Sequence, residues 1–139
     1  MSRHDNILYT GKTTTTGGRD GQSRSSDNRL NIKLSPPSSK GAGTNPEQLF
    51  AAAWSACFTG AMNRAAQEFG VHLPADVAVA AEVDLVANPD EGYFLQARLN
   101  ASLPGIDPVL AQSIVDRAHQ LCPYSKATRG NIQAVVTAV

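Results

Sequence analysis

The sequence has no net charge, no long apolar segment and few cysteines. Its twelve basic residues are balanced by twelve acidic ones, and no continuous basic patch of the kind that binds nucleic acid is present. No apolar run approaches the roughly 20 residues that span a membrane, and the polar first segment, MSRHDNILYTGK, lacks the apolar core of a secretory signal. We therefore expect a cytoplasmic protein that binds neither nucleic acid nor membrane.

Cysteine is scarce, since Cys57 and Cys122 are the only two. A chain of 139 residues buries about two thirds of its unfolded surface, so it needs no disulfide staple. In a reducing compartment, two cysteines so far apart in sequence are more often free or catalytic thiols than a structural bridge.

Histidine is also scarce, and the pattern for a bound metal is incomplete. His119 and Cys122 are three residues apart, which is half of a zinc site, but His4 and His72 are isolated and supply no second pair. We expect no metal and no bound cofactor, and we interpret His119 as a complement to the carboxyl end of a helix.

The apolar patterning predicts an α+β fold in a single domain over residues 1–139, with mostly antiparallel strands. Residues 1–34 are expected to form β structure, and the segment SPPSSKGAGT that follows is a loop rich in Pro, Gly and Ser. The further expected elements are a helix at 46–69 that stops at Gly70, strands at 76–88 and 92–103, a helix from Pro108 to Cys122, and a strand at 131–139.

The helix expected at 46–69 is apolar or small on nearly every face, except over its last third. A helix that is apolar nearly all round is buried nearly all round, and a small monomer has difficulty covering it. The pattern therefore indicates a partner chain against this helix.

Cys57, in the middle of that helix, is open to two interpretations. Its helical neighbours Ala53, Trp54, Gly60 and Ala61 leave room for an approaching group but carry no charge. Composition alone favours an inert core residue. A nucleophile would need a nearby cation, because at an ordinary pKa near 8.5 only about 3% of a thiol is ionised at pH 7.

Two arginines are candidates for that cation. Arg19 lies in TGGRDG, whose glycines let the backbone approach another element, although a solvated turn arginine is the simpler interpretation. Arg64 is two helical turns from Cys57, about 10 Å along the axis, and is the weaker candidate. Glu47 suits the first turn of a helix, and its carboxylate can also orient an arginine.

The spacing of Glu47 and Cys57 restricts how they cooperate. Ten residues separate them, which is about 15 Å along one helix, so an arginine bound to Glu47 does not easily reach Cys57 of the same chain. Two copies of the helix packed antiparallel solve this problem. We therefore infer a site at a homodimer interface.

Cys122 is expected at the exposed end of the second long helix, followed by Pro123 and loop residues. Such a place suits a resolving thiol that swings toward its partner. The alternative interpretation is a packing residue at the end of a helix.

Three stretches, TGGRDG, GAGTNPEQLFAAAWSACF and CPYSKATRGNI, together resemble the organic hydroperoxide resistance branch of the OsmC/Ohr family. They occur in the family's order and roughly at its spacing, and the similarity covers essentially the whole chain. The ATRGN segment favours this branch over its OsmC relatives. The resemblance implies an OsmC-like fold in which mostly antiparallel sheets wrap two central helices of an intertwined homodimer.

The resemblance also implies a thiol-dependent peroxidase and assigns residue roles. Cys57 matches the peroxidatic cysteine and Cys122 the resolving one, while Arg19 matches the arginine that stabilises the thiolate and Glu47 the carboxylate that holds this arginine. The two cysteines would form a disulfide in each cycle, after movement of a loop. An external dithiol, typically on a lipoylated protein, would reduce it.

Several apolar side chains of the helix around Cys57 are candidates for the wall of a slot that accepts alkyl or fatty-acid hydroperoxides. Burial of each CH₂ there contributes about 0.8 kcal/mol and favours organic peroxides over hydrogen peroxide. The alternative for these residues is core or dimer packing. The candidates are Phe50, Trp54, Phe58 and Met62.

Two positions depart from the usual family pattern. Lys126 stands where Asn is usual, which adds a positive charge four residues from Cys122, and Trp54 stands where Tyr or another residue is common. Neither departure removes a catalytic group. Two other function classes remain open: a redox sensor or small-ligand-binding module that uses the thiols without turnover, and a structural dimer with unreactive cysteines.

Overall fold

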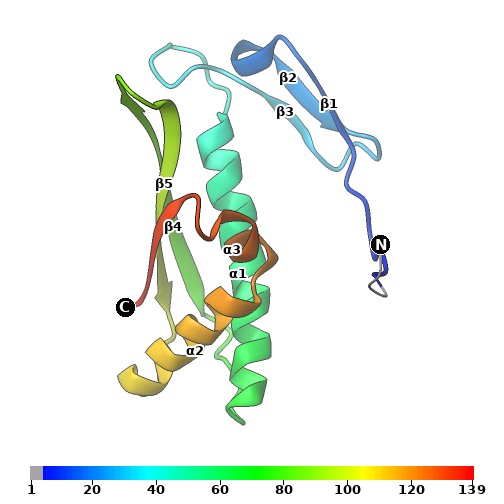
Figure 1. Ribbon diagram of the computed structural model, residues 1–139. Helices are drawn as coiled ribbons and strands as arrows, with labels where there is room; N and C mark the ends of the chain where they lie inside the picture. Colours follow the sequence, from blue (N-terminus) through cyan, green and yellow to red (C-terminus); the bar gives the residue numbers. More distant parts are fainter. Residues whose placement is uncertain (1–4) are drawn as a thin grey trace. The chain divides into compact units, whose positions relative to one another are not determined.

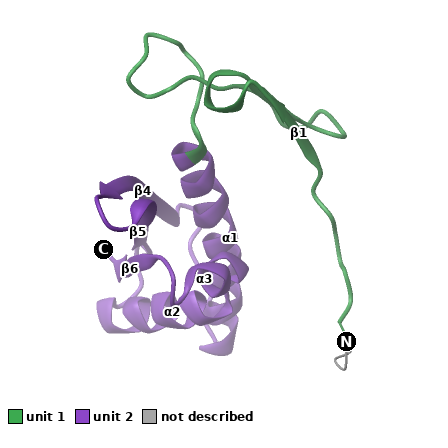
Figure 2. Ribbon diagram, turned by 45° about the horizontal axis from the view of Figure 1, so that its top comes forward, with its two compact units in different colours: residues 1–46 green, residues 47–139 purple. Residues whose placement is uncertain are grey.

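The computed structural model describes residues 5–139, so His4 lies outside the described residues. The chain forms two compact units, the first ending at Pro46 and the second covering Glu47–Val139 (Figure 2). Each unit is described by itself below.

The first unit holds a small antiparallel sheet in the order β1-β2-β3. Its elements are β1 (Thr13–Thr16), the 3-10 turn η1 (Gly18–Asp20), β2 (Gln22–Ser25) and β3 (Asn31–Lys33). The β structure is shorter than expected, because residues 6–12 form no strand. Thr13 pairs with Ser25, which is the last residue of β2. The residues before Thr13 therefore have no further residue of β2 to pair with.

Glycines shape the connection that carries Arg19. Gly17 and Gly18 have φ angles of 74° and 58°, which favour glycine. A Cβ at Gly21 would lie 1.8 Å from the carbonyl oxygen of Thr16, so only glycine fits there. The TGGRDG segment thus forms a tight β1–β2 connection with Arg19 inside η1.

The second unit packs helices against one sheet (Figure 1). Its elements are α1 (Pro46–Glu68), β4 (Ala78–Asn88), β5 (Gly92–Ser102), α2 (Pro108–Leu121), α3 (Pro123–Thr128) and β6 (Gln133–Ala138). The sheet order is β4-β5-β6, with β4 antiparallel to β5 and β6 parallel to β5. The α+β prediction is confirmed.

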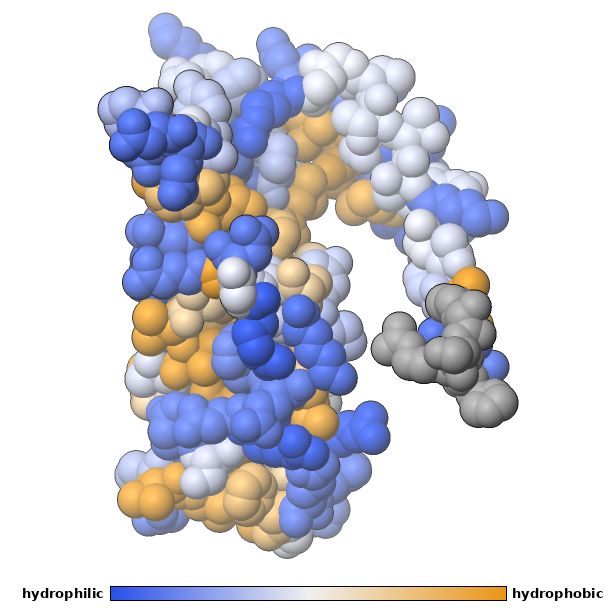
Figure 3. All heavy atoms as spheres, viewed as in Figure 1, coloured by the Kyte–Doolittle hydropathy of each residue, from blue (hydrophilic) through white to orange (hydrophobic). Residues whose placement is uncertain are grey.

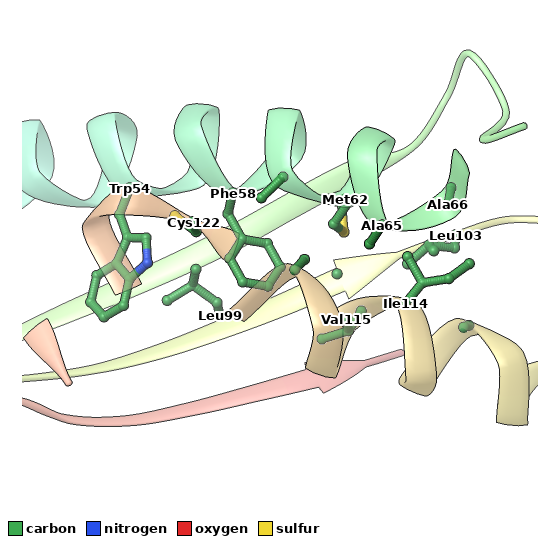
Figure 4. Packing of buried hydrophobic residues seen from close by; sticks show 14 of the residues in the cluster. Trp54, Phe58, Met62, Ala65, Ala66, Leu99, Leu103, Ile114, Val115 and Cys122 are labelled. Atoms are coloured by element: carbon green, nitrogen blue, oxygen red, sulfur yellow. The ribbon is translucent and has the colours of Figure 1, made fainter. Parts of the chain in front are cut away.

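The core of the second unit lies between α1, α2 and the sheet. Trp54, Phe58 and Met62 point from α1 toward β5 and α2, where Leu99 and Ile114 are also fully buried (Figure 4). The burial of each large side chain in this cluster contributes about 1.5–3 kcal/mol to the stability of the unit.

The predicted helix boundaries are largely confirmed. Helix α1 ends at Glu68, and Gly70 follows with a φ angle of 73°. Asp107 caps α2 by accepting hydrogen bonds from the backbone amides of Val109 and Leu110 at 3.1 and 3.2 Å. In residues 5–139, no helix combines the length and the apolar character needed to cross a membrane.

The segment after Cys122 differs from the prediction. Pro123 does end α2, but it also begins the short helix α3, where a loop was expected. Proline cannot continue a helix, yet its fixed φ angle and missing N–H suit the first helical position. Cys122 is the extended residue between the two helices, with φ and ψ angles of −63° and 123°.

Candidate active site

Cys57 lies at the border between the buried and the exposed faces of α1. Trp54 and Phe58, on one side of it, are fully buried, whereas Ala56 and Gly60 are exposed. Cys57 itself is half-buried and is a free thiol. It is therefore open to a small molecule from one side while its sulfur touches the core on the other.

Cys122 is fully buried, so the expectation of an exposed helix end is wrong. The reason is α3, which begins immediately after Cys122 where an open loop was expected. The Sγ atoms of Cys122 and Cys57 are 3.5 Å apart. The two thiols are thus in contact while reduced, and the loop movement expected from the sequence is not needed to bring them into contact.

The surroundings of Cys57 raise the pKa of its thiol. Burial is the main cause, and the neighbouring Cys122 thiol raises the pKa further. The backbone amide of Tyr124 hydrogen bonds to the Cys57 sulfur and acts in the opposite direction. These contacts alone favour the neutral thiol, so a reactive thiolate needs a further cation.

Tyr124 was not singled out in the sequence. Because Pro123 is the first residue of α3, the amide of Tyr124 is one of the N–H groups that a helix start leaves without a partner inside the helix. A cysteine followed by proline and by helix-forming residues was the signal for such a start.

The predicted pocket residues occupy two kinds of place. Trp54, Phe58 and Met62 are fully buried in the core, whereas Phe50 is only half-buried. Phe50 makes edge-to-face contacts with Trp54 and Tyr124, with ring centroids 5.7 and 6.2 Å apart. Their role as pocket walls stays a prediction, and Phe50 is the member of the four whose side chain is accessible.

A buried polar chain lies beside the two sulfurs. The indole nitrogen of Trp54 donates to Ser125 Oγ at 3.1 Å, and His119 Nδ1 lies 2.9 Å from the same oxygen. Burial and the positive charge of Arg129 lower the pKa of His119. The backbone carbonyl oxygen of His119, near the end of α2 as expected, accepts a hydrogen bond from Arg129. The sequence offered no sign that His119 would meet Ser125.

The charged candidates are distributed over both units. Arg19 lies in η1 of the first unit, and Glu47 in the first turn of α1 in the second. Their pairing with Cys57 stays a prediction. Arg64 is exposed, and after Arg117 it helps to lower the pKa of Glu68, whereas it is not among the groups that shift the pKa of Cys57.

Comparison with known proteins agrees with the fold. The sequence profile of the family described as OsmC-like protein matches residues 38–137. The chain is 45% identical to the organic hydroperoxide resistance protein of Xanthomonas axonopodis pv. citri, over 99% of each chain. It is 40% identical to the organic hydroperoxide resistance protein OhrB of Bacillus subtilis, over 90% of this chain and 93% of that one.

Solved structures give the same result. The crystal structure of OhrB of Bacillus subtilis superposes with a TM-score of 0.90 at 37% identity, covering 96% of this chain and 100% of that one. An organic hydroperoxide resistance protein from Legionella pneumophila superposes with a TM-score of 0.89 at 38% identity, covering 96% and 98%. At these identities the similarity extends beyond the fold to the sequence.

Proposed function

Because the chain belongs to the OsmC/Ohr family, in its organic hydroperoxide resistance branch, we propose that it is a thiol-dependent peroxidase that reduces organic hydroperoxides to alcohols. The observation that carries this proposal is the pair of thiols: the half-buried Cys57 and the buried Cys122 have their sulfurs 3.5 Å apart. One thiol is accessible to a substrate, and the other is protected from it.

In the first step, the Cys57 thiolate attacks the distal oxygen of the hydroperoxide. The O–O bond breaks, the alkoxide leaves and takes up a proton to become the alcohol, and Cys57 becomes a sulfenic acid. Thiolate formation supplies only about thirtyfold of the rate, so orientation of the O–O bond along the line of attack supplies the rest.

Arg19 supplies the cation in this account, and Glu47 orients it. The raised pKa of Cys57 in its own surroundings supports this proposal, because burial and Cys122 leave the thiol neutral without a positive charge. The same guanidinium would stabilise the developing alkoxide.

In the second step, Cys122 attacks the sulfenic sulfur of Cys57. An S–S bond forms, the S–O bond breaks, and the hydroxide leaves as water. An external dithiol, for which a lipoylated protein is the proposed carrier, then exchanges with the disulfide and restores both thiols. The contact between the sulfurs supports this step, because an S–S bond of about 2.05 Å requires an approach of only about 1.5 Å.

We assign the substrate to hydroperoxides with an apolar tail. Phe50 presents a half-buried ring on the same helix as Cys57 and packs edge-to-face on Trp54, whereas Trp54, Phe58 and Met62 belong to the fully buried apolar core. Such surroundings favour an alkyl chain over a small polar peroxide.

A homodimer is part of the proposal. Ala52, Ala56 and Gly60 form an exposed stripe along α1, and apolar residues reach the surface among hydrophilic ones (Figure 3). A second copy would cover this stripe and bring its own charged residues to the thiols. The exposed large apolar side chains of the second unit include Leu85, Tyr93 and Val135.

The test adds one equivalent of cumene hydroperoxide or of hydrogen peroxide to reduced protein and follows free thiols over seconds. We expect both thiols to be lost quickly with the organic peroxide, slowly with hydrogen peroxide, and not at all in Cys57→Ser. With one equivalent, Cys122→Ser is expected to stop at the sulfenic acid, and a second equivalent of hydroperoxide should overoxidise it to sulfinic acid. Survival of the wild-type thiols would contradict the proposal and would support the alternative that Cys57 is an inert core residue.

A further inference from the structure

A hydrogen bond between Trp54 and Ser125 lies beside the contact between the Cys57 and Cys122 sulfurs. Trp54 precedes Cys57 by three residues on α1, and Ser125 follows Cys122 by three residues on α3. Residues three apart in a helix share a face, so the two pairs lie about one turn from each other. The bond from Trp54 Nε1 to Ser125 Oγ therefore joins the same two segments as the contact between Cys57 and Cys122.

The indole of Trp54 fixes the direction of the first hydrogen bond, and the tautomer of His119 sets the direction of the second. An indole N–H only donates, so Ser125 Oγ accepts from Trp54 and keeps its own hydrogen for another acceptor. His119 Nδ1, 2.9 Å away, is that acceptor when the imidazole is neutral and carries its proton on Nε2. The lowered pKa of His119 agrees with the neutral form.

The three residues of this hydrogen-bonded chain are held in place by burial and by a further hydrogen bond. Trp54 and Ser125 are fully buried, so neither has a water to replace a lost partner. His119 belongs to α2, and its carbonyl oxygen accepts a hydrogen bond from Arg129, just beyond α3. This hydrogen-bonded chain thus links α1, α2 and α3 around Cys122, the residue between α2 and α3.

We propose that Ser125, bonded to Trp54 and His119, is a positioning residue that holds Cys122 in line for attack on the Cys57 sulfenic acid. This inference rests on the proposed function. The attack forms the S–S bond and expels hydroxide from Cys57, and it competes with a second hydroperoxide that would oxidise the sulfenic acid to sulfinic acid. Ser125 therefore sets how often the cycle ends in a disulfide rather than in overoxidised Cys57.

The main test compares Ser125→Ala with Thr128→Val. Thr128 is also a buried hydroxyl of α3, but it donates to the backbone carbonyl oxygen of Ser125 and not to the side chains of Trp54, Ser125 or His119. Reduced protein is mixed with cumene hydroperoxide, and disulfide and sulfinic acid at Cys57 are quantified by mass spectrometry after quenching. Trp54, the only tryptophan, offers a fluorescence signal to follow alongside the quenched samples.

We expect Ser125→Ala to slow disulfide formation by about tenfold to a hundredfold, the range for a misplaced reacting group, and to raise the sulfinic acid fraction accordingly. Thr128→Val is expected to form the disulfide at the wild-type rate. Equal rates in the two variants, with a fast disulfide in the wild type, would overturn the positioning role alone. A wild type that forms no disulfide would overturn this role together with the proposed function.

A second pair of variants covers the case in which Ser125→Ala fails to fold. The side-chain oxygen of asparagine can occupy the place of His119 Nδ1 as an acceptor, whereas alanine cannot. His119→Asn is expected to keep disulfide formation near the wild-type rate, and His119→Ala to slow it as above. If both variants form the disulfide from the sulfenic acid equally fast, the hydrogen bonds among Trp54, Ser125 and His119 do not position Cys122.

Discussion

At the scale of single residues, the site is defined by what surrounds the Cys57 sulfur. Burial and the Cys122 thiol raise its pKa, and the amide of Tyr124 only partly offsets them. Both cysteines were identified from the sequence, and their disulfide was expected from the family resemblance, but their contact without a loop movement was not, because it depends on where α3 begins. The sequence also missed Tyr124 and Ser125, whose roles arise from a backbone amide and from a contact between distant segments.

Removal of Arg19 tests which cation activates Cys57. In Arg19→Ala, the pKa of Cys57 is expected to rise, because burial and the Cys122 thiol then outweigh the remaining hydrogen bond from the Tyr124 amide. The rate of Cys57 alkylation by iodoacetamide at pH 7, measured in a Cys122→Ser background, should fall by up to about thirtyfold. Arg64→Ala, which removes an exposed arginine of α1, is the matched control and should leave the rate unchanged. Equal rates for the two variants would remove Arg19 from the mechanism.

At the scale of elements, helices with strong end signals were predicted best. Asp107 and Pro108 marked the start of α2, and Gly70 marked the stop of α1, because both signals act within one turn. Helix α3 was missed because proline was interpreted only as a helix end. Its position against Trp54 follows from packing over 71 residues of separation, which local patterns do not contain.

The cap of α2 provides a prediction about stability. Asp107→Ala removes the acceptor for the amides of Val109 and Leu110, and it is expected to lower the free energy of unfolding by about 1 kcal/mol. Asp107→Asn keeps an acceptor and should lose much less. Urea unfolding of the two variants measures the difference, and equal losses would show that the cap contributes nothing.

The β4–β5 pair provides a prediction about pH. Arg98 donates two hydrogen bonds to Asp84, at 2.8 and 2.9 Å, and Gln96 donates a third at 2.8 Å. They hold the pKa of Asp84 at about 2, below its ordinary 3.8. Because the pKa is lowered on folding, the ionised carboxylate stabilises the protein above pH 3.8, and this contribution is lost as the pH falls through about 2.

The urea midpoint of the wild type should therefore fall more between about pH 5 and about pH 2 than that of Asp84→Asn. Asp90→Asn, in the turn between the same strands, is the control and should keep the wild-type decrease. An Asp84→Asn variant with the full wild-type decrease would contradict the linkage.

At the scale of the whole molecule, the chain keeps Arg19 in one compact unit and both cysteines in the other. The sequence predicted the α+β class, and its resemblance to the OsmC/Ohr family agrees with the solved relatives. The single domain, the homodimer and the pairing of Arg19 and Glu47 with Cys57 stay predictions. They depend on contacts between units or copies, which spacing along one chain does not determine.

Mixing of two inactive variants tests whether the site is shared between copies. If Cys57 of one copy works with Glu47 of the other, a hybrid of Cys57→Ser and Glu47→Ala chains contains one intact site. Dissociation and random reassociation of equal amounts should then restore about a quarter of the wild-type peroxidase rate. No recovery, despite hybrids detected by native mass spectrometry, would place Glu47 and Cys57 of each site in the same chain.

The most direct test of the central claim counts alcohol molecules released per protein chain. With excess cumene hydroperoxide and dihydrolipoamide, a peroxidase that cycles through the Cys57–Cys122 disulfide should release many alcohols per chain, and Cys57→Ser should release none above the uncatalysed background. A yield that stops at one alcohol per chain while the dithiol is still present would contradict the account. The protein would then be a stoichiometric redox sensor.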